Sequence, residues 1–162
     1  MVRISRRAAL RALGIAGAAA ASGSLTLALP TTAAAQQLGQ QESVQDGLKR
    51  VFGGRPVKDG SGLIKLDAPF IAENGAVVPV GVEVSGPVTA TDYVKHIYIV
   101  ADKNRIPLVT RATLTPEAGQ ASIGANIRLG ETTDLRVIAE KNDGSLWQVK
   151  REVKVTVGGC GG

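Results

Sequence analysis

The chain of 162 residues has 19 lysine and arginine residues against 14 acidic residues, one histidine and one cysteine. Four of the arginines lie within residues 1–35, so the remainder carries 15 basic and 14 acidic groups and is close to neutral. The high overall pI is therefore no argument for nucleic-acid binding. One cysteine and one histidine also exclude a structural zinc site of the usual Cys/His spacing.

Residues 1–35 have the features of an export signal. The basic start contains no acidic residue, an apolar Gly/Ala-rich stretch follows at 12–21, and small residues at 33–35 indicate cleavage before Gln36. The apolar stretch is too short and too weakly apolar for a membrane span. Arg6 and Arg7, with Leu10 behind them, resemble the twin-arginine signal, so we expect export to the periplasm by that route.

Residues 36–62 are predicted to form an N-terminal helix and a linker. Ser43 is a good N-cap, and the run from Ser43 to Phe52 has helical periodicity. Gly47 weakens this helix, which therefore needs a surface to pack on. Residues 55–62 are typical of a linker. The apolar face of the predicted helix comprises Val44, Leu48, Val51 and Phe52.

From Leu63 onward the hydrophobic period changes to two, which indicates strands. Asn74-Gly75 predicts a tight turn, and Pro79 predicts a sheet edge or a bulge. No helical crossovers separate the strands, which favours an all-β, immunoglobulin-like antiparallel β-sandwich over residues 63–157. The predicted strands are 63–66, 78–84, 97–101, 107–114, 121–127, 135–139 and 147–157.

The last five residues, 158–162, predict a flexible arm that presents a single thiol. Cys160 has two glycines on each side, and a core cannot form around such a residue at the end of a chain. Structural cysteines in an oxidising compartment normally occur in pairs, so an unpaired one is either an intermolecular disulfide partner or a reactive group. The glycines of the predicted arm are Gly158, Gly159, Gly161 and Gly162.

The sequence offers little chemistry besides this thiol. His96 alternates with apolar residues and is expected to be a solvated strand residue, and the carboxylates are scattered singly. No cofactor motif, metal site or phosphate-binding loop is present in the sequence. We therefore expect no catalytic residue and no cofactor, and interpret the chain as a non-catalytic covalent carrier whose thiol is activated by the enzymes that it visits.

Two segments resemble the SoxY family, the sulfur carriers of bacterial thiosulfate oxidation. Residues 158–162 match the terminal Gly-Gly-Cys-Gly-Gly signature of that family, and residues 71–80 (Ile-Ala-Glu-Asn-Gly-Ala-Val-Val-Pro-Val) resemble an interior segment. The resemblance implies an immunoglobulin-like domain in a heterodimer with a second β-sandwich subunit, SoxZ. It also implies that Cys160 holds thiosulfate-derived sulfur covalently.

The same resemblance implies a set of periplasmic partner enzymes. A haem-containing cytochrome would couple thiosulfate to the thiol, and a dimanganese hydrolase would release sulfate. In some organisms a molybdenum–haem dehydrogenase oxidises the remaining sulfane sulfur.

Two other functions are compatible with parts of the sequence. A ubiquitin-like sulfur carrier would load sulfur on the terminal carboxylate of Gly162, but it needs ATP-dependent activation, which the periplasm lacks. An exported structural or interaction protein could instead use Cys160 for an intermolecular disulfide. A non-reducing gel distinguishes such a structural protein from a carrier, because a purely structural disulfide would be present in nearly all molecules.

Overall fold

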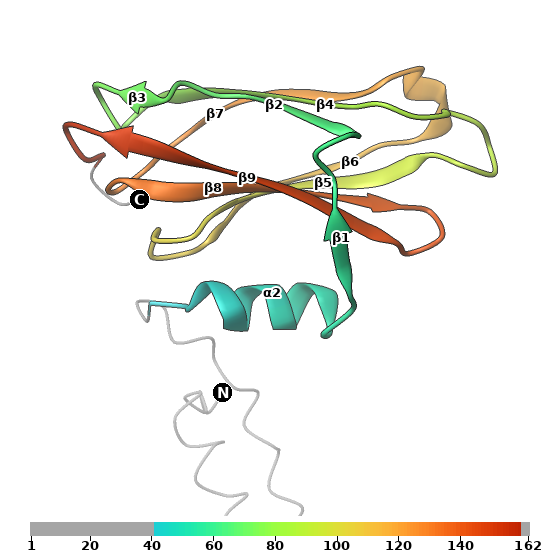
Figure 1. Ribbon diagram of the computed structural model, residues 1–162, viewed down its shortest axis with the longest axis horizontal. Helices are drawn as coiled ribbons and strands as arrows, with labels where there is room; N and C mark the ends of the chain where they lie inside the picture. Colours follow the sequence, from blue (N-terminus) through green and yellow to red (C-terminus); the bar gives the residue numbers. More distant parts are fainter. Residues whose placement is uncertain (1–40, 160–162) are drawn as a thin grey trace, which may run out of the picture. The chain divides into compact units, whose positions relative to one another are not determined.

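The computed structural model describes residues 41–159, which form a β-sandwich with one α-helix against its outer face (Figure 1). A single 3₁₀ turn, η1 (Pro116–Ala118), precedes β7. The other elements are α2 (Val44–Phe52), β1 (Val57–Asp59), β2 (Ile64–Asp67), β3 (Ile71–Ala72), β4 (Val78–Val84), β5 (Val94–Ala101), β6 (Leu108–Thr113), β7 (Ala121–Ile127), β8 (Thr133–Lys141) and β9 (Leu146–Val155).

The larger sheet has the strand order β1-β9-β8-β5-β6, and β3 adds to it beside the end of β9. The smaller sheet has the order β2-β4-β7. All pairs are antiparallel except β1 with β9 and β3 with β9, which are parallel. The predicted antiparallel β-sandwich is thus confirmed, with two short parallel additions on one strand.

The core lies between the two sheets and follows from the period-two pattern of the strands. In β4, every second residue from Val78 to Val84 is buried against the larger sheet, and Pro79 and Glu83 face outward. β5 is buried along most of its length on both faces, because the sandwich core covers one face and α2 covers the other. The completely buried core residues of the larger sheet include Ile97, Ile99, Leu135 and Val137.

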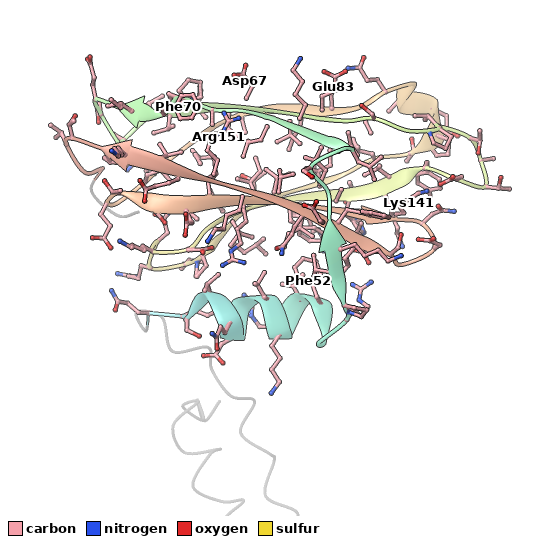
Figure 2. The ribbon with its side chains drawn as sticks, in the orientation of Figure 1. Phe52, Asp67, Phe70, Glu83, Lys141 and Arg151 are labelled. Atoms are coloured by element: carbon pink, nitrogen blue, oxygen red, sulfur yellow. The ribbon has the colours of Figure 1, made fainter. Side chains whose placement is uncertain are left out.

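Helix α2 covers the outer face of the larger sheet, as its amphipathic pattern requires. Ser43 caps it, since its side-chain oxygen accepts a hydrogen bond from the backbone N–H of Asp46 at 3.1 Å. Gly53 ends it in the left-handed conformation, at φ 62°. Phe52 points from the helix toward the sheet (Figure 2) and packs edge-to-face on Tyr98, with ring centroids 4.9 Å apart. The predicted helix is confirmed.

A partly buried polar contact joins the end of α2 to the sheet. The Tyr98 hydroxyl donates to Glu140 at 2.8 Å, and Arg55 donates to the other oxygen of the same carboxylate at 2.7 Å. Burial, together with this acceptor, raises the pKa of Tyr98 to about 12. Burial alone would raise the pKa of Glu140, but the hydrogen bonds from Arg55 and Tyr98 outweigh it and lower that pKa.

The structure differs from the sequence-based prediction in the segment between α2 and residue 63. Residues 55–62, expected to be a linker, contain β1, which pairs with β9 through Val57↔Leu146 to Asp59↔Gln148. All three residues of β1 are exposed, so no alternation marks it in the sequence. The short strand β3 was also missed, because two residues carry no periodicity.

Pro79 lies where β4 has a strand on one side only. It pairs with Asn126 of β7, whereas β2 pairs with β4 only from Gly81 to Val84. The expected edge is therefore found, on the side where β2 has ended, and no bulge is needed. Proline is tolerated there because its missing N–H costs no ladder hydrogen bond.

The predicted export signal, residues 1–35, lies outside the described residues. Within residues 41–159, no helix is long and apolar enough to span a membrane.

We expect the Tyr98 contact to make stability pH-dependent at the alkaline end. A folded-state pKa above the unfolded value means that the stabilisation is complete below about pH 10 and is lost between about pH 10 and 12. The stabilisation lost in this range amounts to about 3 kcal/mol. Tyr98→Phe should cost about 1 kcal/mol at neutral pH and should abolish the alkaline loss. Urea unfolding at several pH values measures the free energy of unfolding and its alkaline loss, with Tyr93→Phe as the control variant. An unchanged alkaline slope in Tyr98→Phe would contradict the assignment.

Candidate functional site: the base of the C-terminal arm

Cys160, Gly161 and Gly162 lie outside the described residues, but the chain that leads to them is described as far as Gly159. β9 ends at Val155, at the end of the sandwich where β4, β6 and β8 begin (Figure 1). The base of the arm, residues 156–159, continues beyond β9 at this end. Its contacts fix the position of the chain up to Gly159, the last described residue before the cysteine.

The base of the arm runs parallel to the segment 70–75. Lys154 N–H donates to the Phe70 carbonyl at 2.9 Å, and Thr156 N–H donates to the Ala72 carbonyl at 3.1 Å. One step further, Gly75 N–H donates to the Val157 carbonyl at 2.7 Å. The ladder that starts as β3 and β9 therefore continues past the last residue of β9, almost to the cysteine.

The loop between β7 and β8 completes this arrangement from the other side. Leu129 is completely buried and bonds to both segments: its N–H donates to the Gly75 carbonyl at 2.8 Å, and its carbonyl accepts from Gly159 N–H at 3.0 Å. Three backbone segments far apart in the sequence are thus joined at Gly75, Leu129 and Gly159. Gly75 and Gly159 are both buried.

Glycine is required here because the backbones approach too closely for a side chain. A Cβ at Gly159 would lie 2.7 Å from the Cα and N of Ala76 and from the carbonyl carbon of Gly75. A Cβ at Gly158 would overlap the Gly130 carbonyl oxygen, and one at Gly75 would overlap the Leu129 carbonyl oxygen. None of these three glycines has positive φ, so the missing Cβ is what the site needs.

Asn104 supports this arrangement from the loop between β5 and β6. It is one of two buried polar side chains in the described part of the chain. Its Nδ2 donates to the Arg128 carbonyl at 2.8 Å, and its Oδ1 accepts from Gly130 N–H at 3.2 Å. One amide group therefore holds both sides of Leu129 in place.

Large apolar side chains are exposed at the same end of the sandwich. Phe70 is 72% exposed, although the Arg151 guanidinium stacks over its ring at 5.0 Å (Figure 2). Three further exposed side chains lie close in sequence to the bonded residues: Ile71 is next to Ala72, Val77 is two residues after Gly75, and Val157 is next to Gly158. We call this set the apolar rim: Phe70, Ile71, Val77, Ile106 and Val157.

The histidine lies far from the arm. His96 pairs with Glu140 near the end of β8, while the arm base lies beside the beginning of β8. From His96 to Ala101 alone, β5 covers about 17 Å. Burial lowers the pKa of His96, whose ring also contacts Thr113 at 3.1 Å. His96 is partly buried rather than fully solvated.

Among residues 41–159, no group of three or more His, Cys, Asp or Glu side chains is placed to hold a metal ion.

The structure brings together the two segments that carried the family resemblance. Residues 71–80 and the start of the arm lie side by side, joined by the bonds at Ala72 and Gly75. Of the predicted arm glycines, Gly158 and Gly159 pack against the sandwich, and Gly161 and Gly162 lie outside the described residues. Asn104 and Gly75 were not identified from the sequence as part of this site, since Asn104 lies in a polar loop and Asn74-Gly75 indicated only a turn.

The fold and this site define a class of small β-sandwich proteins in which a glycine-packed segment beyond the last strand leads to a cysteine. The family model described as "Sulfur oxidation protein SoxY" matches residues 48–160, ending on the cysteine. The chain is also similar to the sulfur carrier protein SoxY from Chlorobium limicola f thiosulfatophilum, with 32% identity and a TM-score of 0.59. That match covers 71% of this chain and 97% of the other. The chain belongs to the SoxY family of sulfur-oxidation proteins.

Other solved structures share the fold alone. The superoxide reductase (neelaredoxin) from Ignicoccus hospitalis has 21% identity and a TM-score of 0.51, over 57% of this chain and 80% of that one. A point variant of the same reductase has 18% identity and a TM-score of 0.53, over 70% of this chain and 93% of that one. No curated protein matched the chain.

Replacing Asn104 should loosen the arm base and destabilise the protein. Asn104→Ala leaves the Arg128 carbonyl and the Gly130 N–H without their side-chain partner, which costs about 1–3 kcal/mol. Asn142→Ala is the matched control, because Asn142 makes the same two kinds of backbone bond but is exposed. Chemical denaturation should show the larger loss for Asn104→Ala. Equal losses would mean that burial of the Asn104 amide has no effect.

Proposed function

We propose that the protein is a sulfur carrier that holds thiosulfate-derived sulfur covalently on Cys160 and presents it to separate enzymes. The observation that supports this most is the position of the cysteine. It follows directly after a base that is bonded to two other segments, at the end of the sandwich that carries the apolar rim. Membership of the SoxY family and the match ending at residue 160 support the same function.

The proposed chemistry has two steps on the thiol. In the first, the Cys160 thiolate and the sulfane sulfur of thiosulfate form an S–S bond, giving Cys–S–S–SO₃⁻, and two electrons pass to a haem cytochrome. In the second, water breaks the bond between the sulfane sulfur and the sulfonate. This hydrolysis releases sulfate and two protons and leaves the persulfide Cys–S–S⁻, which a sulfane dehydrogenase can oxidise further.

The carrier itself contributes no catalytic residue in this proposal. His96 lies near the start of β5, whereas the arm base lies at the end of the sandwich where β5 ends, so the histidine is not placed to act as a base on the thiol. The partner enzymes supply the haem, and for sulfate release the dimanganese centre. The carrier supplies the thiol, its position and a surface for these enzymes to bind.

The apolar rim supports the proposal that the protein works with partners. Exposed apolar groups gathered at one end of a small domain are typical of a binding surface. We propose a heterodimer with a SoxZ-like β-sandwich subunit, together with transient complexes with the cytochrome and the hydrolase. Most rim residues lie in or next to the segments that the arm base is bonded to, so an enzyme that receives the thiol would also contact the rim.

We propose that the protein acts in the periplasm after export by the twin-arginine route. The basic start of the chain supports this, with Arg6 and Arg7 in the pattern of that signal. Sulfate release outside the cytoplasm would also keep the reactive persulfide away from cytoplasmic thiols.

Cys160→Ser should abolish sulfur loading and leave the fold intact. In cells grown on thiosulfate, mass spectrometry of the tryptic peptide after Lys154 should detect the added S–SO₃ and persulfide sulfur on wild type only. Thermal unfolding of the variant should match wild type. A cysteine found only as an intermolecular disulfide, indifferent to thiosulfate, would contradict the carrier function and favour the structural alternative.

Replacing both Arg6 and Arg7 with lysine should block export. The twin-arginine route requires the arginine pair, so the variant should accumulate in the cytoplasm with its leader uncleaved. Cell fractionation measures this. Normal periplasmic processing of the variant would show that another export route is used.

A further inference from the structure

The glycines at the arm base would ordinarily be interpreted as a source of flexibility, but their geometry indicates a different role. Gly75, Gly158 and Gly159 have ordinary φ angles, and each approaches another backbone more closely than a Cβ allows. Gly124 in β7 is different: a Cβ there would have no atom within 4 Å. Among the described glycines, only the three of the arm base would place a Cβ less than 3.0 Å from backbone atoms of another segment.

The hydrogen bonds at the arm base explain why the approach is so close. Gly75 donates to Val157 at 2.7 Å and accepts from Leu129 at 2.8 Å, while Gly159 donates to Leu129 at 3.0 Å. These bonds require three backbones to lie within one ladder spacing of each other, about 4.8 Å, with no side chain between them. Side chains at these glycines would force the segments apart and break the bonds.

We propose that Gly75, Gly158 and Gly159 are positioning residues that fix the base of the arm to the sandwich, so that Cys160 starts from a defined point. The chain that can leave the surface without breaking this packing then begins after Gly159. If the base were released as far as Thr156, the arm would gain three residues, or about 10 Å of reach. The packed base therefore keeps the thiol close to the apolar rim.

This placement has a consequence for the partner enzymes, and this step rests on the proposed function. A thiol one residue beyond a fixed point reaches only a few ångströms into another protein. The partner must therefore bring its reactive centre close to the carrier surface, in contact with the rim. Fixing the base also reduces the conformational entropy that is lost when the thiol enters the enzyme.

A nitroxide probe on Cys160 tests the proposal, because the chain has no other cysteine. The variants are Gly159→Ala, Gly161→Ala and the matched control Gly124→Ala, each adding one methyl group. If the glycines act only as a flexible tether, Gly159→Ala and Gly161→Ala should both slow the probe, since alanine restricts the backbone. A packed base predicts the opposite for Gly159→Ala, with the rotational correlation time of the probe shortened at least about twofold.

Gly124→Ala should leave the probe unchanged. Slowed or unchanged motion in Gly159→Ala would overturn the proposal, even if the protein unfolds at the same temperature as wild type. Gly158→Ala provides a second test from the other side of the base, because its Cβ would overlap Gly130 rather than Ala76. It should also mobilise the probe, and unchanged motion would again contradict the packed base.

The probe experiment tests the packed arm base separately from the proposed carrier function. The probe reports on the arm base whether or not Cys160 carries sulfur in the cell. Sulfur loading is measured on the tryptic peptide, and its result does not depend on how the probe moves. In the reconstituted system, Gly159→Ala should raise the KM for the carrier more than it lowers kcat, because it impairs placement and not the thiol. An effect on kcat alone would contradict positioning.

Discussion

The structure depends on the sharing of one edge of β9 between two short strands. β8 pairs along nearly the whole of β9 on one side, while β1 and β3 pair with the other side at opposite ends. Between them the chain leaves for the other sheet and forms β2. β9 is therefore the element that connects the helix-bearing N-terminal part, the smaller sheet and the arm. The position of the cysteine follows from where this strand ends and what continues its ladder.

Much of the fold was predictable because it follows from local patterns. The cap at Ser43, the amphipathic period of α2 and the alternation in β4 and β7 each act over a few residues, and the structure contains all of them. β1 and β3 could not be predicted, since their residues are exposed or too few to show a period. Their stability comes from backbone bonds to β9, whose pairing residues lie more than 80 positions later in the chain.

The candidate site was predictable in its chemistry but not in its construction. The lone Cys160 between glycines identified the reactive group without any structure. The packing of Gly158 and Gly159 could not be deduced, because it depends on Leu129 and Gly75, which the sequence places in an ordinary loop and a turn. Asn104 had no signal either, since an asparagine in a polar loop is normally solvated. Glycine is ambiguous in a sequence because flexibility and close packing require the same residue.

The shared edge of β9 also determines when the domain can form during synthesis. Every partner of β9 precedes it in the chain, so none of its three pairings can exist before residues 146–159 have left the ribosome. The contact between Phe70 and Lys154 closes a loop of more than 80 residues, which makes it slow and entropically costly. A nascent chain thus exposes the edge of β8 until β9 arrives. The contacts beside the cysteine are therefore among the last that this domain can form as its chain is synthesised.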